Sequence, residues 1–340
     1  MEKRKAEVLF LSEEEVQKCI TYRESVQIAE EVLRQQGLGN VEMPPKQLLN
    51  LRKHGLDSYA NSMPAYLKYL GVAGIKWGGG FGANLTEKRL PYMVQTIILA
   101  SPITGMPFAM MSATFITTLK TGAETAVAGK FLSVTDKPMV VTIIGVGAQG
   151  TGALESWLAL HELGDLRVEE FRLVDISEEA AESAAARLEG RFGGRVLATT
   201  DVERGVRGAD AIVTATHSEE PIVRNEWLKP GSYVGSLGSY PEIDPQGVLK
   251  ADRLYVDNWE QNLHRGEFQN LIEAGKLTRE SIVGELPDLV AGKVPGRQNA
   301  SERIVASLIG LGSIDLGFAV RIAENAKVQG LGQRVTFMEY

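Results

Sequence analysis

The sequence predicts an α/β protein of two domains, and three observations carry this prediction. With 340 residues the chain is long enough for two hydrophobic cores. Its first third shows a helical pattern followed by strand-like apolar runs, typical of an α+β domain with a mostly antiparallel sheet. From residue 127 short apolar strands alternate with helices, which indicates a parallel sheet covered on both faces.

Each element follows from its local pattern. The helical period covers 13–36 and ends at Gly37, and strands are expected near 46–51, 72–77, 93–100 and 106–112. Ser177 precedes two acids and predicts the start of a helix in the middle of the chain. A long helix and a last strand close the chain, and we expect them to return to the first domain. The expected domains are therefore 1–126 with 306–340, and 127–305.

Composition restricts the class of protein. The net charge is −7, which argues against a binder of nucleic acid or of a membrane surface. The single cysteine, Cys19, excludes an intrachain disulfide and favours a reducing compartment. The start of the chain lacks the apolar core of a signal peptide. The uncharged run 90–119 is divided by Pro102, Gly105 and Pro107 into pieces too short for a membrane helix. A cytoplasmic protein is expected.

A dinucleotide-binding fingerprint occupies the start of the second domain. The stretch "VTIIGVGAQGTG" contains Gly145-x-Gly147-x-x-Gly150, with a predicted strand before it and a predicted helix after it. The first glycine permits a tight turn, the second lets the backbone approach a pyrophosphate, and the third lets helix and strand pack closely. The helix start, Ala148 and Gln149, offers amide N–H groups to the phosphates. This is the pattern of a Rossmann domain.

Asp175 ends the next predicted strand and selects the cofactor. An acid at this place accepts hydrogen bonds from the ribose hydroxyls and repels a 2′-phosphate, and the residues that follow, beginning with Ile176, include no Arg or Lys. NAD(H) is therefore favoured over NADP(H). The alternative is a purely structural glycine turn beside a loop acid. No P-loop, CxxC or HExxH motif is present, and the four histidines lack ligand spacing, so no metal is implied.

The chain resembles the ornithine cyclodeaminase/mu-crystallin family over nearly its whole length. The markers are "NSMPAY", "GIKW", "ITTLKTGAETAVAGKFL", the glycine loop, "EPIVRNEWLKPGSYVGSLG", "VGELPDLVAGKVPGR" and "GLGSIDLGFAVRIAENA". The resemblance implies a substrate and dimerisation domain formed from both chain ends, a Rossmann domain in the middle, an active site in the cleft between them, and a homodimer. The further residues it implies for the cofactor are Thr121, Thr216, Gly238 and Asp315, with a plain helix-cap role as the alternative for Asp315.

Three lysines match the family's carboxylate-binding positions. The resemblance places Lys46, Lys76 and Lys120 where the family usually carries Arg, Lys and Arg. Two positions therefore depart from the pattern, and lysine is a point charge that cannot form a two-pronged contact with a carboxylate. The alternative for each lysine is a solvated or snorkelling side chain.

A second departure concerns the reaction. The resemblance implies an Asp two residues after a glycine, as in the cyclodeaminases and the alanine dehydrogenase of the family. This chain has Gly238-Ser239-Tyr240 instead, and tyrosine binds an ammonium poorly. The resemblance then implies an NAD(H)-dependent imino-acid reductase or amino-acid dehydrogenase that acts on a small anionic substrate. Lys76, Tyr240 and His217 are the candidate proton donors. The alternatives are a packing aromatic for Tyr240 and an exposed loop histidine for His217. The alternatives are a cyclodeaminase-type ammonia lyase that uses NAD catalytically, and a non-catalytic dinucleotide-binding protein of the mu-crystallin type.

Overall fold

The computed structural model describes residues 4–84, 86 and 90–340, and the chain divides into two compact units. Unit 1 comprises Met1–Lys120 and Leu311–Tyr340, and unit 2 comprises Thr121–Gly310. Both chain ends therefore belong to one unit. The divisions lie a few residues from the expected ones, because helix α3 (Thr114–Leu132) runs through the first of them without a break.

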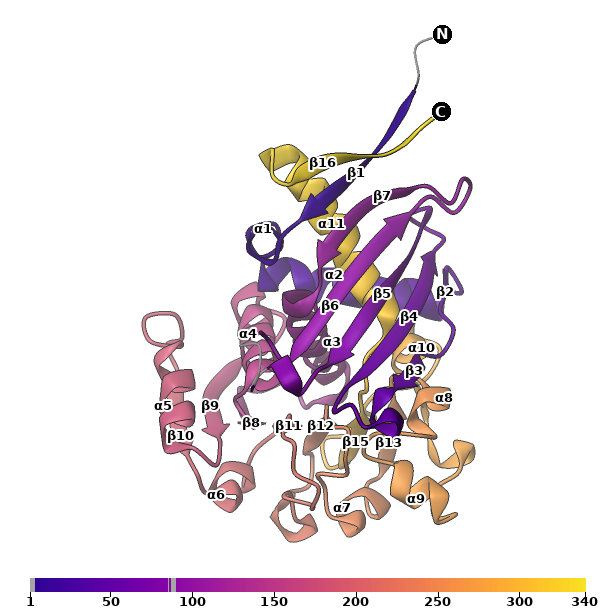
Figure 1. Cartoon of the computed structure of the whole chain (residues 1–340). Helices are drawn as coiled ribbons and strands as arrows, with labels where there is room; N and C mark the ends of the chain where they lie inside the picture. Colours follow the sequence, from indigo (N-terminus) through magenta and orange to yellow (C-terminus); the bar gives the residue numbers. More distant parts are fainter. Residues whose placement is uncertain (1–3, 85, 87–89) are drawn as a thin grey trace. The chain divides into compact units, whose positions relative to one another are not determined.

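Unit 1 is a mixed sheet with helices (Figure 1). The strand order is β16-β1-β7-β6-β5-β4-β2, with β3 paired to β4, and all pairs are antiparallel except β1 with β7. The strands are β1 (Lys5–Leu11), β2 (Val41–Glu42), β3 (Gln47–Asn50), β4 (Tyr59–Leu67), β5 (Val72–Gly80), β6 (Met93–Ala100), β7 (Pro107–Ser112) and β16 (Gln333–Glu339). The last strand pairs with the first, so the tail returns to this unit as expected.

Helix α11 (Gly312–Gln329) packs on this sheet and against α2 (Tyr22–Gly37). The approach is close: a Cβ at Gly317 would lie 2.5 Å from Cγ2 of Val32, and one at Gly74 would lie 3.2 Å from Cδ2 of Leu316. Glycine at these two positions therefore lets α11 reach α2 and β5. A continuous helix over 13–36 was wrong, because Thr21 and Glu24 form a capping box that starts α2 anew after α1 (Glu13–Lys18).

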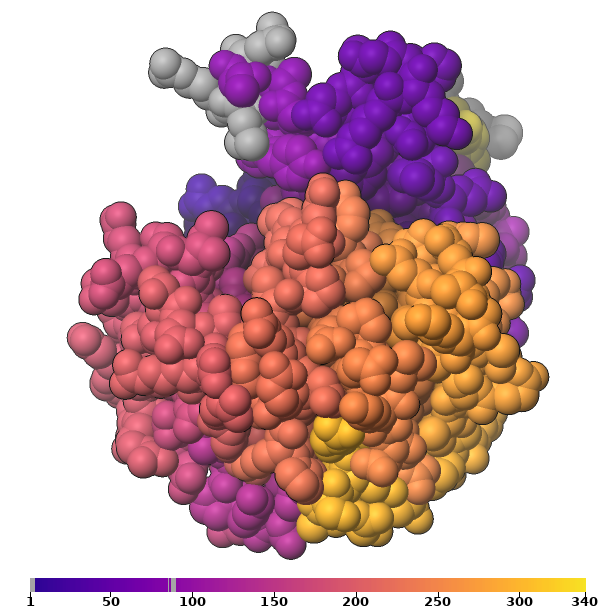
Figure 2. All heavy atoms as spheres, turned by 90° about the horizontal axis from the view of Figure 1, so that it is seen from below, coloured from indigo at the N-terminus to yellow at the C-terminus, as the bar shows by residue number. Residues whose placement is uncertain are grey.

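Unit 2 is a parallel sheet of order β10-β9-β8-β11-β12-β15-β13-β14. The strands are β8 (Met139–Ile144), β9 (Val168–Val174), β10 (Arg195–Thr199), β11 (Ala211–Thr214), β12 (Tyr233–Ser236), β13 (Arg253–Val256), β14 (Gly284–Glu285) and β15 (Ile304–Ser307). Every residue of β8, β11, β12 and β15 is buried, as expected for a sheet covered on both faces. In the view from below, the surface of unit 2 passes from pink through salmon to orange, which is the direction of the sequence (Figure 2).

The helices of unit 2 occupy the connections between its strands (Figure 1). They are α4 (Ala148–Leu163), α5 (Glu178–Ala186), α6 (Val202–Val206), α7 (Pro245–Leu249), α8 (Trp259–Asn262), α9 (Gln269–Glu273) and α10 (Leu286–Val290). Ser177 caps α5 as predicted, since its Oγ accepts the amide N–H of Ala180 at 3.2 Å. Within the described ranges no helix is both long and apolar enough to cross a membrane.

Candidate functional site

The glycine turn between β8 and α4 uses its three glycines in three different ways. Gly145 has φ +83°, and a Cβ there would lie 2.7 Å from the carbonyl oxygen of Ala215. A Cβ at Gly150 would overlap the carbonyl oxygen of Gly145. A Cβ at Gly147 would meet no described atom within 4 Å. Gly145 and Gly150 therefore build the turn, while Gly147 keeps a space open above the backbone.

Helix α4 begins at this turn with amide groups available to an anion. Gly147 is its N-cap, and no side chain in the described part of the chain caps it. The first residues, Ala148 and Gln149, point their amide N–H groups out of the helix end, which also carries the positive end of the helix dipole. The open space at Gly147 and this uncapped helix end fit a pyrophosphate.

Asp175 follows β9 and is held against the glycine turn. Its Oδ2 accepts the amide N–H of Val146 at 2.9 Å, and its Oδ1 accepts the amide N–H of Ser177 at 3.0 Å. Each carboxylate oxygen retains a second lone pair for a hydroxyl donor. Ile176, next to it, is fully exposed. The residues of the turn and Asp175 therefore fit the phosphate and ribose of NAD(H).

Two loops extend from the carboxyl ends of neighbouring strands β11 and β12. The first carries Thr216 and the exposed His217, and the second carries the buried Gly238 and the exposed Tyr240. Thr216 donates from its amide N at 2.8 Å and from its Oγ1 at 2.5 Å to Oε1 of Glu242. In open α/β sheets ligands bind at this edge. Thr121 lies separately, partly buried in α3.

Sequence reasoning missed two acids at this edge, Glu242 and Glu267. They are 0% and 2% exposed. Burial raises the pKa of Glu267 to about 7, and the charge of Glu242 contributes to that shift. Burial also raises the pKa of Glu242, although hydrogen bonds from Thr216 oppose it. The only signal in the sequence was an acid inside each of the short runs "SYPEID" and "HRGEF".

In unit 1, Lys76 is the centre of a buried polar group. Its Nζ lies 2.7 Å from Oδ2 of Asp315 and 3.2 Å from Oγ1 of Thr117, and the side chains of the ion pair are 4% and 0% exposed. The hydroxyl of Thr117 in turn donates to Oε1 of Gln95. Lys76 comes from β5 and Asp315 from the first turn of α11.

The helix-cap alternative for Asp315 was wrong. The N-cap of α11 is Leu311, and no side chain among the described residues caps this helix. Asp315 lies four residues further on and faces Lys76. A buried carboxylate needs a cation or hydrogen-bond donors, and Lys76 supplies the cation.

The other two lysines also belong to unit 1. Lys120 is 4% exposed and lies in α3, and Lys46 is partly buried between β2 and β3. A surface-only role for Lys120 was therefore wrong, because its side chain is almost completely enclosed. Burial of an ammonium is costly unless anions or polar groups surround it.

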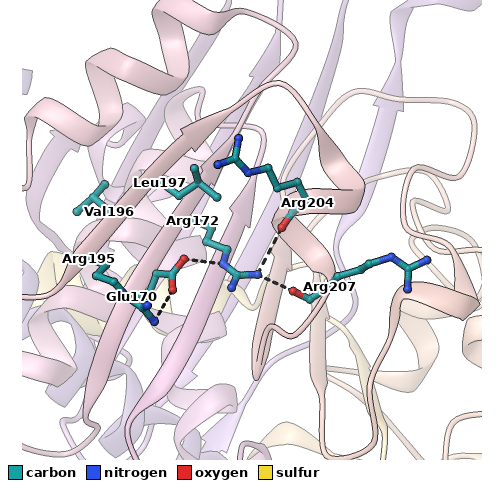
Figure 3. Close-up of a pocket in the computed structure, with 7 residues that line it drawn as sticks. All are labelled: Glu170, Arg172, Arg195, Val196, Leu197, Arg204 and Arg207. Atoms are coloured by element: carbon teal, nitrogen blue, oxygen red, sulfur yellow. Dashed lines mark hydrogen bonds and ion pairs between the residues drawn. The ribbon is translucent and has the colours of Figure 1, made fainter.

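A cavity of about 690 Å³ lies elsewhere in unit 2, on the face formed by β9, β10 and α6 (Figure 3). The guanidinium groups of Arg172, Arg195 and Arg207 already have partners. Arg172 donates to Glu170 at 2.8 Å and to the carbonyl oxygens of Gly205 and Arg207, and Arg195 pairs with Glu170 at 2.8 Å. Arg172 therefore holds the end of α6 on the sheet, and we do not assign this cavity to the reaction.

Within 4–84, 86 and 90–340 there is no group of three or more His, Cys, Asp or Glu residues that could hold a metal ion. Cys19 is buried and forms no disulfide.

The parallel sheet, the glycine turn and Asp175 define a dinucleotide-binding protein of the Rossmann class. The chain belongs to the ornithine cyclodeaminase/mu-crystallin family, whose model matches residues 6–330. An alanine dehydrogenase of Archaeoglobus fulgidus is 32% identical over 335 residues, 97% of this chain and 99% of that protein.

Two solved structures share the fold. One is an archaeal alanine dehydrogenase dimer with bound NAD, 30% identical, with a TM-score of 0.88 over 98% of this chain and 100% of the other. The second is the Δ1-pyrroline-2-carboxylate reductase of Thermococcus litoralis with NADH and L-proline, 28% identical, with a TM-score of 0.87 over 96% and 100%. The predicted fold class and family are thereby confirmed.

Proposed function

We propose that the protein is an NAD(H)-dependent oxidoreductase that acts on the C–N bond of a small 2-imino or cyclic ketimine acid, or of the matching amino acid. The observation that carries this proposal is the glycine turn with Asp175 bound against it. The similar proteins are an alanine dehydrogenase and a pyrroline-2-carboxylate reductase, and their structures hold NAD and NADH. Both reactions exchange a hydride at a carbon that carries nitrogen.

The cofactor residues are assigned as follows. Gly145, Gly147 and Gly150 with the start of α4 bind the pyrophosphate, and Asp175 binds the ribose hydroxyls. Thr121, Thr216, Gly238 and the exposed Ile176 complete the set. When bound, NADH supplies the hydride for reduction. A carboxylate at Asp175 and an uncharged Ile176 disfavour a 2′-phosphate, so NADH is preferred over NADPH.

The substrate residues are the lysines of unit 1. Lys76 and Lys120, with Lys46, bind the substrate carboxylate and so orient the imine carbon. Asp315 fixes the position of the Lys76 ammonium at 2.7 Å, so its part in the site is to hold Lys76. Reduction also needs one proton at the imine nitrogen, and Lys76, Tyr240 and His217 are its candidate donors.

The same residues serve the reverse reaction. Hydride then leaves the amino acid, the proton donor takes up the proton, and water hydrolyses the imine to a 2-oxo acid and ammonia. Tyr240 stands where cyclodeaminases of this family carry an acid, which argues against the lyase reaction. We further propose a cytoplasmic homodimer. The dimer of the similar archaeal structure and the exposed apolar side chains Trp77, Val94 and Ile98 on the sheet of unit 1 support this assembly.

The test is NADH oxidation by purified protein with excess ammonia and a panel of 2-oxo acids, and with preformed cyclic ketimines. We expect turnover with at least one substrate, little with NADPH, and at least about a hundredfold lower kcat/KM in Lys120→Ala, a loss of about 3 kcal/mol of transition-state binding. Lys130→Ala on the same helix is the matched control, since Lys130 pairs with Asp165 at 3.2 Å.

Three results would contradict the proposal. Ammonia released from ornithine or lysine without net change in NADH would establish the lyase instead. Tight NADH binding with no turnover of any substrate would establish a non-catalytic protein. Equal activity in Lys120→Ala and wild type would remove Lys120 from the substrate site.

A further inference from the structure

The carboxyl edge of the parallel sheet carries a row of hydroxyl groups that neither the glycine turn nor the lysines use. The last residues of three neighbouring strands are Thr214 of β11, Ser236 of β12 and Ser307 of β15, and they lie opposite one another in register. All three are buried. Glu242 and Glu267 are inserted at this edge.

Glu267 connects the loop after β12 to strand β15. Its Oε2 accepts the amide N–H of Glu242 at 2.9 Å, and its Oε1 accepts the amide N–H of Ile243 at 3.1 Å. Its own amide N–H donates to Oγ of Ser307 at 3.2 Å. Both carboxylate oxygens are thus engaged as acceptors. Glu267 therefore fixes the backbone of the loop after β12 to β15.

Glu242 connects the loops that follow β11 and β12. Its Oε1 accepts two hydrogen bonds from Thr216, and its Oε2 lies beside Gly238, where an added Cβ would overlap it. Its carbonyl oxygen accepts the amide N–H groups of Ile222 and Val223. One side chain thus connects the loop 215–218, which carries His217, to the loop 237–241, which carries Tyr240.

The carboxylates of Glu242 and Glu267 have more acceptor oxygens than nearby donors, and no cation faces them among the described residues. No ion pair is found for either glutamate among the residues that the structure describes. Oε2 of Glu242 accepts no hydrogen bond of good geometry, although Thr214 and the amide of Gly238 lie near this carboxylate and lower its pKa. Two buried carboxylates that influence each other titrate as one system, and holding one proton removes half of the buried charge. Burial raises the pKa of both carboxyl groups, so the pair shares one proton.

The other titratable side chains on the packed segments are His217, Tyr240, His264 and Arg265. Arg265 donates to Oγ of Ser239 at 2.5 Å. Asp257, at the end of β13, accepts the amide N–H groups of Ile309 and Gly310. The exposed His217 carries an imidazole on one of the two loops that Glu242 connects. Any test must therefore separate its effect from that of the pair.

We infer that Glu242 is a positioning residue for the cofactor. While Glu242 and Glu267 share one proton, Glu242 holds the loops 215–218 and 237–241 in the conformation that binds NADH. Loss of that proton weakens NADH binding. The inference rests on the proposed NADH binding. The physical cause is that a second buried negative charge without a cation is relieved when the Glu242 loop moves toward water.

The experiment measures the Kd of NADH by fluorescence at pH 6.0 and pH 8.5, without substrate. In wild type we expect the Kd to rise about tenfold, within the usual range for two coupled equilibria. In Glu242→Gln a neutral amide replaces one of the two buried carboxyl groups, so the Kd should stay near the wild-type value of pH 6.0 at both pH values. Glu170→Gln, at a buried glutamate of the same sheet, should follow wild type. His217→Gln should keep the wild-type ratio of the two Kd values, whatever its own Kd.

The outcomes separate this inference from the proposed function. A Kd that is equal at both pH values in wild type overturns the inference alone, as does an unchanged pH dependence in Glu242→Gln or its loss in His217→Gln. No NADH binding at either pH overturns the proposed function and the inference with it. Should Glu242→Gln not fold, Glu267→Gln serves instead, with the Kd of wild type and variant measured at closely spaced pH values across the same range. Without the neighbouring charge the midpoint of the pH dependence moves to lower pH, and an unmoved midpoint overturns the inference.

Discussion

Replacing Lys76 by methionine removes the cation that faces Asp315 inside unit 1. The two side chains are 4% and 0% exposed and lie 2.7 Å apart, so solvent screens their interaction little. Breaking a buried pair by removal of one partner costs about 3–5 kcal/mol, because the remaining charge stays buried. We therefore expect Lys76→Met to lose about 3–5 kcal/mol of unfolding free energy. Asp315→Asn should cost less, since the amide oxygen still accepts a hydrogen bond.

Urea unfolding followed by circular dichroism measures the loss of unfolding free energy. A double-mutant cycle of Lys76→Met and Asp315→Leu then gives the coupling energy between the two residues. Replacing both charges by apolar side chains is often close to neutral, so the double variant should be more stable than Lys76→Met. Lys130→Met is the matched control, because its pair with Asp165 is partly exposed and should contribute less than about 1 kcal/mol. A coupling energy below about 1 kcal/mol for Lys76 and Asp315 would refute the prediction that this buried pair stabilises unit 1.

Three further predictions concern unit 2. Gly150→Ala should abolish NADH binding and destabilise the fold, because its Cβ would overlap the backbone of the turn. Gly147→Ala should leave the free energy of unfolding within about 0.5 kcal/mol of wild type but raise the Kd of NADH at least about tenfold. Urea unfolding measures the stability of both variants, and fluorescence titration measures the Kd. Asp175→Ala with Ile176→Arg should reverse the preference toward NADPH in the same titration, at no packing cost because Ile176 is fully exposed. Burial raises the pKa of Glu267 from 4.5 to about 7, so the folded state binds more protons than the unfolded state between these pH values. The free energy of unfolding should therefore fall by about 3 kcal/mol as pH rises from 4.5 to 7. Urea unfolding across this range measures the change, and Glu267→Gln should flatten the profile.

The parallel sheet of unit 2 was predictable because its signals are local. Each strand is a short apolar run, the glycine turn needs a strand before it and a helix after it, and Ser177 marks a helix start by its own side chain. All of these depend on residues close in the chain. The glycine turn and Asp175 could therefore be placed from sequence alone.

Unit 1 was less predictable for the same reason. Strand β4 was not expected, because "YANSMPAYL" contains Pro64, and a proline inside a run usually argues against a strand. The helical pattern over 13–36 hid the restart at Thr21, where a capping box outweighs the apolar period. The contact of Lys76 with Asp315 joins β5 to a helix near the other end of the chain, and no spacing rule reaches so far.

Glu242 also bears on the choice between reductase and lyase. The family resemblance implies an Asp at the position of Tyr240, as in the cyclodeaminases and the alanine dehydrogenase. Glu242, two residues further on, is the only acid of the loop 237–243. Its carboxylate is turned inward, is fully buried and accepts from Thr216 at 2.8 Å, so it is committed to holding the two loops. A carboxylate in that position does not replace the missing acid as a partner for a substrate ammonium. The side chains of this loop therefore suit a substrate whose nitrogen enters as an imine, and Tyr240→Asp is the variant in which ammonia release from ornithine should first become measurable.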